Sequence, residues 1–182
     1  MDKWKIDKRK TVYSDDWVKL HVDKIASSTG AKTDYVYIER TGTGMAIVPY
    51  FEKSESVLLV KQYRHPLRKS IWQFPGGGKE KNKSFTQTAK LELLDETGYE
   101  VGALIDLGKY YPDPGISSDQ GRIFLALNPT KKYDKPKVDP LEKIEIKGVK
   151  LTTLDNIIKS GWIRDGWTLG AYSLFKIWLQ KK

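Results

Sequence analysis

Alternating apolar and polar residues mark the first part of the chain. Residues 18–25 alternate in this way, a Ser/Thr/Gly turn follows at 27–30, and a β-rich run resumes at 35–38, so this region is predicted to form a β-hairpin. Short apolar runs predict further strands at residues 45–51, 57–63, 71–74, 104–111, 123–127 and 144–151. Strands are therefore expected to dominate the first two thirds of the chain.

Helical patterns are expected at residues 84–97 and 165–180, with a shorter helix at 154–159. Ser84 and Gln87 have the spacing of a capping box, and Gly98 supplies the left-handed position that ends a helix. The fold class is thus α+β. Because no linker or repeat divides the chain, we expect a small N-terminal β subdomain over residues 1–42 and a main domain over residues 43–182.

Composition narrows the classes of function. The chain has 182 residues, 39% of them hydrophobic, and no cysteine, which excludes disulfide scaffolds, thiolate zinc sites and cysteine nucleophiles. No segment has the pattern of a signal peptide or membrane span, so we expect a cytoplasmic protein without a membrane partner. The net charge of +9 suits nucleic acid, an anionic surface or an anionic small substrate, although the lysine-dense segments 3–10 and 131–150 have the composition of solvated surface.

Candidate chemistry lies on the predicted helix 84–97. Glu92, Asp95 and Glu96 stand at positions i, i+3 and i+4 and so share one stripe of that helix. Crowded carboxylates favour a cation among them, and oxygen ligands select Mg²⁺ or Mn²⁺. The run Pro75-Gly76-Gly77-Gly78 precedes the helix and allows its backbone to approach a ligand closely. A divalent-metal site is the sharper interpretation, and a solvated acidic face is the alternative.

Residues 77–99 resemble the Nudix box, G-x5-E-x7-R-E-U-x-E-E-x-G-U, where U is a bulky aliphatic residue. The spacing fits without a gap, with matches at Gly77, Glu92, Leu93, Glu96 and Gly98. Three positions depart from the box: Lys83 replaces its first glutamate, Leu91 its arginine, and Asp95 its penultimate glutamate. The similarity extends over about residues 33–175 and is closest to the ADP-ribose and nucleoside-diphosphate-sugar pyrophosphatase branch. It is carried by four further segments, at residues 60–66, 72–77, 111–115 and 163–169.

The resemblance implies a fold, a set of site residues and an assembly. The fold would be a Nudix α/β/α sandwich with a mixed sheet and an N-terminal β-hairpin subdomain, assembled as a homodimer that exchanges its N-terminal strands. The metal ligands would be the Gly76 carbonyl, Glu92 and Glu96, with Asp95 as an additional ligand. The catalytic positions would be Glu96 and a late-loop acid that activates water, Glu142 or else Asp139. Arg64 and Arg40 would bind the substrate.

The implied activity is hydrolysis of the pyrophosphate bond of ADP-ribose or a nucleotide sugar, giving a nucleoside monophosphate and a sugar phosphate, with Mg²⁺ or Mn²⁺ as cofactor. Two alternatives stay open. Leu91 and Lys83 would suit a Nudix module that binds nucleotide without cleaving it. The net charge of +9 would suit an RNA 5′-end pyrophosphohydrolase, but no nucleic-acid-binding signature accompanies it, so we expect no nucleic-acid partner.

Overall fold

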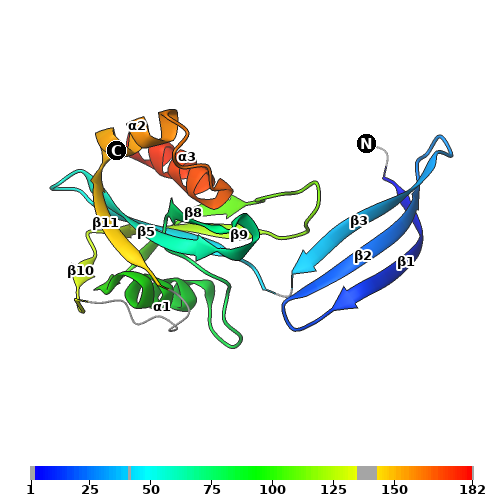
Figure 1. Cartoon of the computed structure of the whole chain (residues 1–182), viewed down its shortest axis with the longest axis horizontal. Coiled ribbons are helices and arrows are strands. Elements are labelled where there is room, and N and C mark those ends of the chain that lie inside the picture. Colours follow the sequence, from blue (N-terminus) through cyan, green and yellow to red (C-terminus); the bar gives the residue numbers. More distant parts are fainter. Residues whose placement is uncertain (1–2, 41, 135–142, 182) are drawn as a thin grey trace. The chain divides into compact units, whose positions relative to one another are not determined.

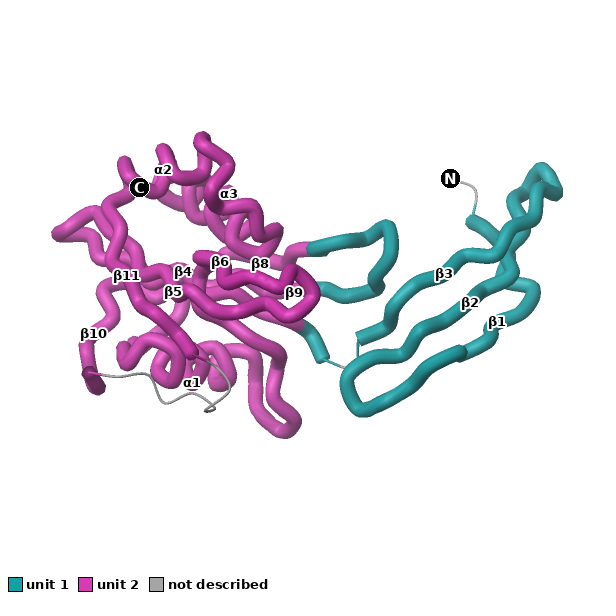
Figure 2. The backbone as a smooth tube through the Cα atoms, viewed as in Figure 1, with its two compact units in different colours: residues 1–43, 111–120 teal, residues 44–110, 121–182 magenta. Residues whose placement is uncertain are grey.

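The protein forms two compact units in the computed structural model, which describes residues 3–40, 42–134 and 143–181. Unit 1 comprises residues 1–43 and 111–120, and unit 2 comprises residues 44–110 and 121–182 (Figure 2). The chain therefore passes between the two units three times. The segment 111–120 belongs to unit 1 although it is distant in sequence from the N-terminal strands.

Unit 1 is built on a three-stranded antiparallel sheet with the order β1-β2-β3. The predicted hairpin is confirmed as β2 (Val18–Ala26) and β3 (Lys32–Arg40), which pair antiparallel. Strand β1 (Lys5–Ser14) was not predicted, and all ten of its residues are exposed. An edge strand that buries no face carries no apolar alternation, so the pattern of this segment gave no signal for it.

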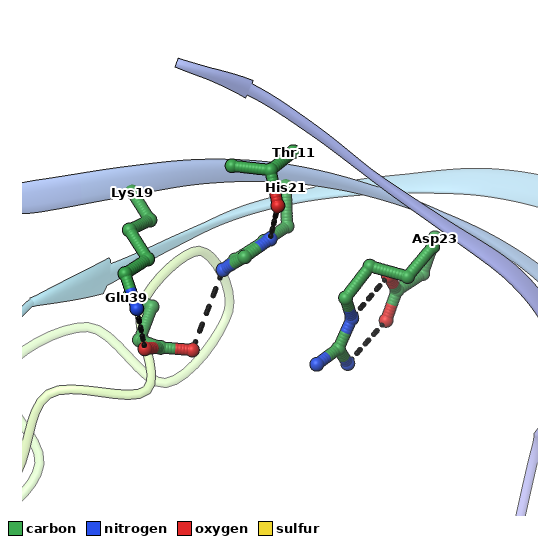
Figure 3. A network of polar contacts seen from close by, with 6 residues as sticks. Thr11, Lys19, His21, Asp23 and Glu39 are labelled. Carbon is green, nitrogen blue, oxygen red and sulfur yellow. Dashed lines mark hydrogen bonds and ion pairs between the residues drawn. The ribbon is translucent and has the colours of Figure 1, made fainter. Parts of the chain in front are cut away.

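Polar pairs connect the strands of this sheet (Figure 3). Arg9 on β1 donates two hydrogen bonds of 2.8 Å to the carboxylate of Asp23 on β2. This contact with the guanidinium lowers the pKa of Asp23. The buried ring of His21 bonds to Thr11 at 3.1 Å through Nδ1 and lies 3.3 Å from Glu39 through Nε2. The network thus joins all three strands through charged and polar groups.

Unit 2 contains a six-stranded mixed sheet with the order β11-β5-β4-β9-β8, with β6 paired to β5. Strands β4 and β9 are parallel, and the other pairs are antiparallel. Two short strands, β7 (Tyr99–Glu100) and β10 (Thr130–Lys131), pair separately, and a short 3-10 helix, η1 (His65–Leu67), follows β5. The bounds of the sheet strands are β4 Met45–Phe51, β5 Ser56–Arg64, β6 Lys69–Gln73, β8 Leu104–Tyr110, β9 Gly121–Leu127 and β11 Glu145–Lys150.

Helices cover both faces of the unit 2 sheet, with α1 (Phe85–Thr97) on one side and α2 (Leu151–Lys159) and α3 (Gly166–Gln180) on the other (Figure 1). The sequence of β4 is apolar throughout because both faces of this strand are covered by helices. Met45 and Ile47 pack in the core cluster that contains Ala89 and Leu93 of α1. The alternate residues Ala46, Val48 and Tyr50 pack in the cluster of α2 and α3. The predicted α+β sandwich with a mixed sheet is confirmed.

The second helix begins earlier than the sequence predicts, at Leu151 rather than residue 154, with Lys150 as its N-cap. The chain passes from β11, which ends at Lys150, directly into this helix, so the gap predicted between strand and helix does not exist. Within the described ranges 3–40, 42–134 and 143–181, no helix has the length and apolar character needed to cross a membrane.

Candidate active site

The glycine loop, residues Pro75–Gly78, is held by backbone pairing with the start of β4. Ile47 N donates to Pro75 O and Met45 N to Gly77 O, each at 2.8 Å, and Gly44 forms a bridge with Gly78. Backbone groups of a paired segment alternate in direction. The polar groups of Gly76 therefore point away from β4, and its N–H donates to Glu96 Oε2 of α1 at 2.8 Å.

The loop backbone at positions 76 and 77 lies so close to neighbouring atoms that a side chain larger than that of glycine would collide with them. A Cβ on Gly76 would lie 2.2 Å from the carbonyl oxygen of Met45, and its φ is +155°. A Cβ on Gly77 would lie 2.3 Å from Oε1 of Glu92. Two consecutive loop residues thus contact the carboxylates of two consecutive turns of α1.

The helix that presents these carboxylates has the ends predicted from its sequence. Gln87 N donates to Ser84 Oγ at 3.2 Å, and Ser84 N donates to Gln87 Oε1 at 2.8 Å, which completes the capping box. Gly98, with φ +74°, donates its N–H to Leu94 O at 2.8 Å and ends the helix. The capped helix fixes the turn-by-turn positions of the residues that face the loop.

Three residues at intervals of four form one stripe of α1: Thr88, Glu92 and Glu96. Glu92 and Glu96 face the glycine loop, and Thr88 contacts the segment that follows it. Glu80 N donates to the hydroxyl of the buried Thr88 at 3.3 Å. On the core side, Ala89 and Leu93 are fully buried. Burial of this neighbouring stripe sets the rotation of α1, and the rotation directs the two glutamates to the loop.

The site can offer oxygen ligands to a divalent cation. The Glu96 side chain is buried, with the residue only 4% exposed, and Glu92 is half-buried. Over the described residues, no three or more Asp, Glu, His or Cys side chains form a ready-made metal cluster. Asp95, on the same helix, stays a predicted additional ligand. The donors that the structure brings together are two carboxylates and the Gly76 backbone, a set that fits Mg²⁺ or Mn²⁺.

Two of the three departures from the box, at positions 83 and 91, have distinct surroundings. Lys83, which stands where the box has glutamate, forms an ion pair with Glu80 in the segment that leads into α1. Leu91, which stands where the box has arginine, is half-buried. The positive charge of Lys83 is thus partly balanced by an acid three residues before it.

Arg64 lies at the end of β5 and is held by a chain of side-chain amides. Its Nε donates to Gln73 Oε1 at 3.0 Å, and Gln73 Nε2 donates to Gln62 Oε1 at 3.4 Å. Both glutamines are buried. Because Gln73 ends β6 and Phe74–Pro75 follow it at once, Arg64 is tied to the strand that leads into the glycine loop.

Three predicted site residues have not yet been described: Arg40, Glu142 and Asp139. Arg40 belongs to unit 1, where its Nε lies 3.8 Å from the buried carboxylate of Asp119. Glu142 and Asp139 lie outside the described residues. Unit 1 also contains a cavity of about 340 Å³, lined by Trp4, Tyr35 and Tyr37 and by residues of the 114–118 segment.

Sequence reasoning missed three residues that contact the loop or its flanks: Thr88, Gln73 and Thr168, whose hydroxyl accepts a hydrogen bond of 3.0 Å from Phe74 N. Thr88 carries a detectable signal, because it precedes Glu92 by one helical turn on the same stripe. Gln73 and Thr168 act on backbone or side chains that only the fold brings near. No local spacing in the sequence could have indicated them.

Comparison with solved structures first defines the class of fold. The chain matches a crystal structure of an ADP compounds hydrolase with a TM-score of 0.86, over 98% of this chain and 95% of that chain, at 19% identity. The family model of the NUDIX domain matches residues 40–168. The chain belongs to the Nudix family, as residues 77–99 predicted.

Two bacterial relatives cover nearly the whole chain, and a mouse relative covers just over half of it. An ADP-ribose pyrophosphatase of Bacillus subtilis is 26% identical over 166 residues, which are 91% of this chain and 88% of the relative. A methanol dehydrogenase activator of Bacillus methanolicus is 28% identical over 170 residues, 93% of this chain and 91% of the relative. An ADP-sugar pyrophosphatase of Mus musculus is 28% identical over 111 residues, 56% of this chain and 51% of the relative.

Proposed function

We propose that the protein is a metal-dependent pyrophosphohydrolase that cleaves ADP-ribose or a nucleoside-diphosphate sugar into a nucleoside monophosphate and a sugar phosphate. The observation that carries the proposal is the contact of Glu92 and Glu96 with two consecutive glycines of the loop. Membership of the Nudix family and the names of the relatives that act on ADP-ribose and ADP-sugars support the class of substrate.

The proposed mechanism assigns a task to each residue. Glu92, Glu96 and the Gly76 carbonyl, with Asp95 as an additional ligand, would hold Mg²⁺ or Mn²⁺. When bound, the cation would neutralise charge on the diphosphate and lower the pKa of bound water. Arg64 binds the diphosphate, and its hydrogen bond to Gln73 fixes the plane of the guanidinium. Glu142, or Asp139 in its place, accepts the proton of the water that attacks phosphorus. The bridging P–O bond then breaks and leaves the two monophosphates.

Glu96 is the residue on which the proposal is tested most directly. Glu96→Gln keeps the shape of the side chain but removes the charge that binds the cation, so we expect activity to fall by at least about 10²-fold. Glu100→Gln is the matched control, because Glu100 is exposed and pairs with Lys132 on the surface. Wild-type turnover in Glu96→Gln would remove Glu96 from the site.

A substrate panel separates the three candidate functions. ADP-ribose, nucleotide sugars, dinucleoside polyphosphates and 5′-triphosphate RNA are each assayed with Mg²⁺ and with Mn²⁺. Leu91 in place of arginine favours the binding-module alternative, and binding of ADP-ribose without cleavage under every condition would establish it. Cleavage of the RNA alone, with steep salt dependence of RNA binding, would favour the RNA-end activity.

We further propose that the protein is a homodimer in which residues 1–42 serve dimerisation and substrate contacts, with Arg40 acting in the partner's site. The fully exposed strand β1, which in the described sheet pairs only with β2, supports this proposal because it presents an open edge. Light scattering should report twice the chain mass of 20.9 kDa. A fully active monomer would contradict both the dimer and the role of Arg40 in the partner.

A further inference from the structure

The first turn of α3 contacts the strand that leads into the glycine loop. Thr168, fully buried on this turn, accepts a hydrogen bond of 3.0 Å from Phe74 N through its hydroxyl. Phe74 directly precedes Pro75, the first residue of the loop, and stands 94 residues before Thr168. The hydroxyl thereby satisfies a backbone N–H at the point where the chain leaves β6 and enters the loop.

The same turn also contacts the segment against which the loop pairs. The ring of Trp167 lies so close to Gly44 that a Cβ there would be 2.7 Å from its atoms Cη2 and Cζ2. Gly44 forms the bridge with Gly78 at the far end of the loop. Trp167 therefore supports the exit of the loop, while its neighbour Thr168 holds the entry.

Local hydrogen bonds keep this turn rigid. Asp165 caps α3 by accepting from Thr168 N at 2.8 Å through its carboxylate. The hydroxyl of Tyr110 donates to Gly166 O at 2.9 Å, and its ring meets that of Trp167 edge-on at a centroid distance of 5.6 Å. The two supporting side chains thus project from a capped and packed turn.

We infer that Thr168 and Trp167 are positioning residues that set the geometry of the cation-binding loop, an inference that rests on the proposed function. The loop is supported at both ends, by Thr168 at Phe74 and by Trp167 at Gly44. Without the Thr168 hydroxyl, the buried N–H of Phe74 loses its hydrogen-bond acceptor. Because an unsatisfied buried N–H is costly, the backbone at Pro75–Gly76 shifts to bond it elsewhere. That shift moves the Gly76 backbone relative to Glu96, which weakens cation binding without altering a ligand.

The experiment measures Mn²⁺ binding to the purified protein by electron paramagnetic resonance, with thermal melting followed by circular dichroism. Thr168→Val keeps the size of the side chain and removes the acceptor, so we expect the dissociation constant for Mn²⁺ to rise about tenfold, as for loss of a residue that supports a ligand. Thr168→Ser keeps the acceptor and should bind Mn²⁺ within about twofold of the wild type.

Tyr172→Phe is the matched control on the same helix. It removes a hydroxyl that bonds to Asp155 of α2 at 2.6 Å and touches no part of the loop. Tyr172→Phe should lower the melting temperature and leave Mn²⁺ affinity unchanged. If Thr168→Val and Tyr172→Phe weaken Mn²⁺ binding in proportion to their loss of stability, Thr168 is merely structural and the inference fails.

A second variant covers the case in which Thr168→Val does not fold. Asp165→Ala removes the half-buried carboxylate that caps α3 and so loosens its first turn, which carries Thr168 and Trp167. Mn²⁺ affinity should therefore again fall. If Thr168→Val folds and binds Mn²⁺ as tightly as the wild type, the inference is overturned and the proposed function is not. If Thr168→Val does not fold, wild-type Mn²⁺ affinity in Asp165→Ala has the same consequence. Absence of Mn²⁺ binding in the wild type would overturn the proposed metal site and this inference with it.

Discussion

Substitution of the loop glycines by alanine tests how closely the loop backbone must approach the carboxylates of α1. The perturbation is one added methyl group at Gly76 or at Gly77. Gly102→Ala is the matched control, because a Cβ there meets no atom within 4 Å. The two loop positions should fail in different ways, since Gly77 faces a side chain and Gly76 faces the backbone of β4.

At Gly77 the new methyl group collides with the end of a side chain. Its Cβ would lie 2.3 Å from Glu92 Oε1 and 2.7 Å from Cδ, whereas ordinary contact begins near 3.4 Å. The carboxyl group must therefore retreat by about 1 Å, and a misplacement of this size costs about 10²-fold in rate. Because a rotamer change of Glu92 accommodates the methyl group, stability should change by less than about 1 kcal/mol.

At Gly76 the obstacle is backbone, which cannot rotate away. The Cβ would lie 2.2 Å from Met45 O and 2.9 Å from Ala46 Cα, and the φ of +155° strains any other residue. Overpacking of this kind costs about 1–3 kcal/mol or more. At about 2–4 °C per kcal/mol for a chain of this size, Gly76→Ala should melt several degrees below the wild type.

The assay combines thermal melting with turnover of ADP-ribose at saturating and limiting Mn²⁺. We expect Gly77→Ala to melt like Gly102→Ala and to lose activity, and Gly76→Ala to lose both stability and activity. Full activity in Gly77→Ala would refute the reasoning, because the loop would then not need to contact Glu92. Equal stability of Gly76→Ala and Gly102→Ala would contradict the close approach of the loop to β4.

Three further predictions concern the box and the contact between α2 and α3. Lys83→Glu should tighten apparent Mn²⁺ binding, because it replaces a positive charge by a negative one in the segment that leads into α1. Leu91→Arg should raise turnover at limiting Mg²⁺. Titration of activity with each metal checks both, and weaker Mn²⁺ binding in Lys83→Glu would contradict the first. Burial, and then the hydrogen bond to Asp155, raise the pKa of Tyr172 to about 12. Asp155→Asn should lower this pKa only in part, because burial persists; ultraviolet titration would count against the assignment if the pKa stayed at its wild-type value.

The hydrogen bond between Tyr172 and Asp155 also predicts how the free energy of unfolding depends on pH. The Tyr172 hydroxyl, followed by Lys176, lowers the pKa of Asp155 below its ordinary value of 3.8. A lowered pKa contributes stability that is fully present above the ordinary value and is lost as the pH falls through the lowered one. The stability difference between wild type and Tyr172→Phe should therefore narrow in acid, and denaturant titrations at neutral and acid pH check this. A difference that widened in acid would contradict the sign.

The sequence by itself determined the elements whose signals are local. The capping box at Ser84 and the left-handed Gly98 bound α1 because both act within one helical turn. The apolar run 45–51 predicted β4, because a central strand buries both faces. The spacing of Glu92 and Glu96 placed both carboxylates on one stripe for the same reason of local geometry.

Only the tertiary structure decided which strands, helices and loops contact one another. Exposed β1 escaped prediction because its strand character comes from pairing with β2 and not from an apolar pattern. The support of the glycine loop by Thr168 joins residues 94 positions apart, and no periodicity of the chain encodes such a contact. Local preference fixes which residues share a face, whereas the packing of β4, α1 and α3 fixes which faces come together, and the loop acquires its geometry from that packing.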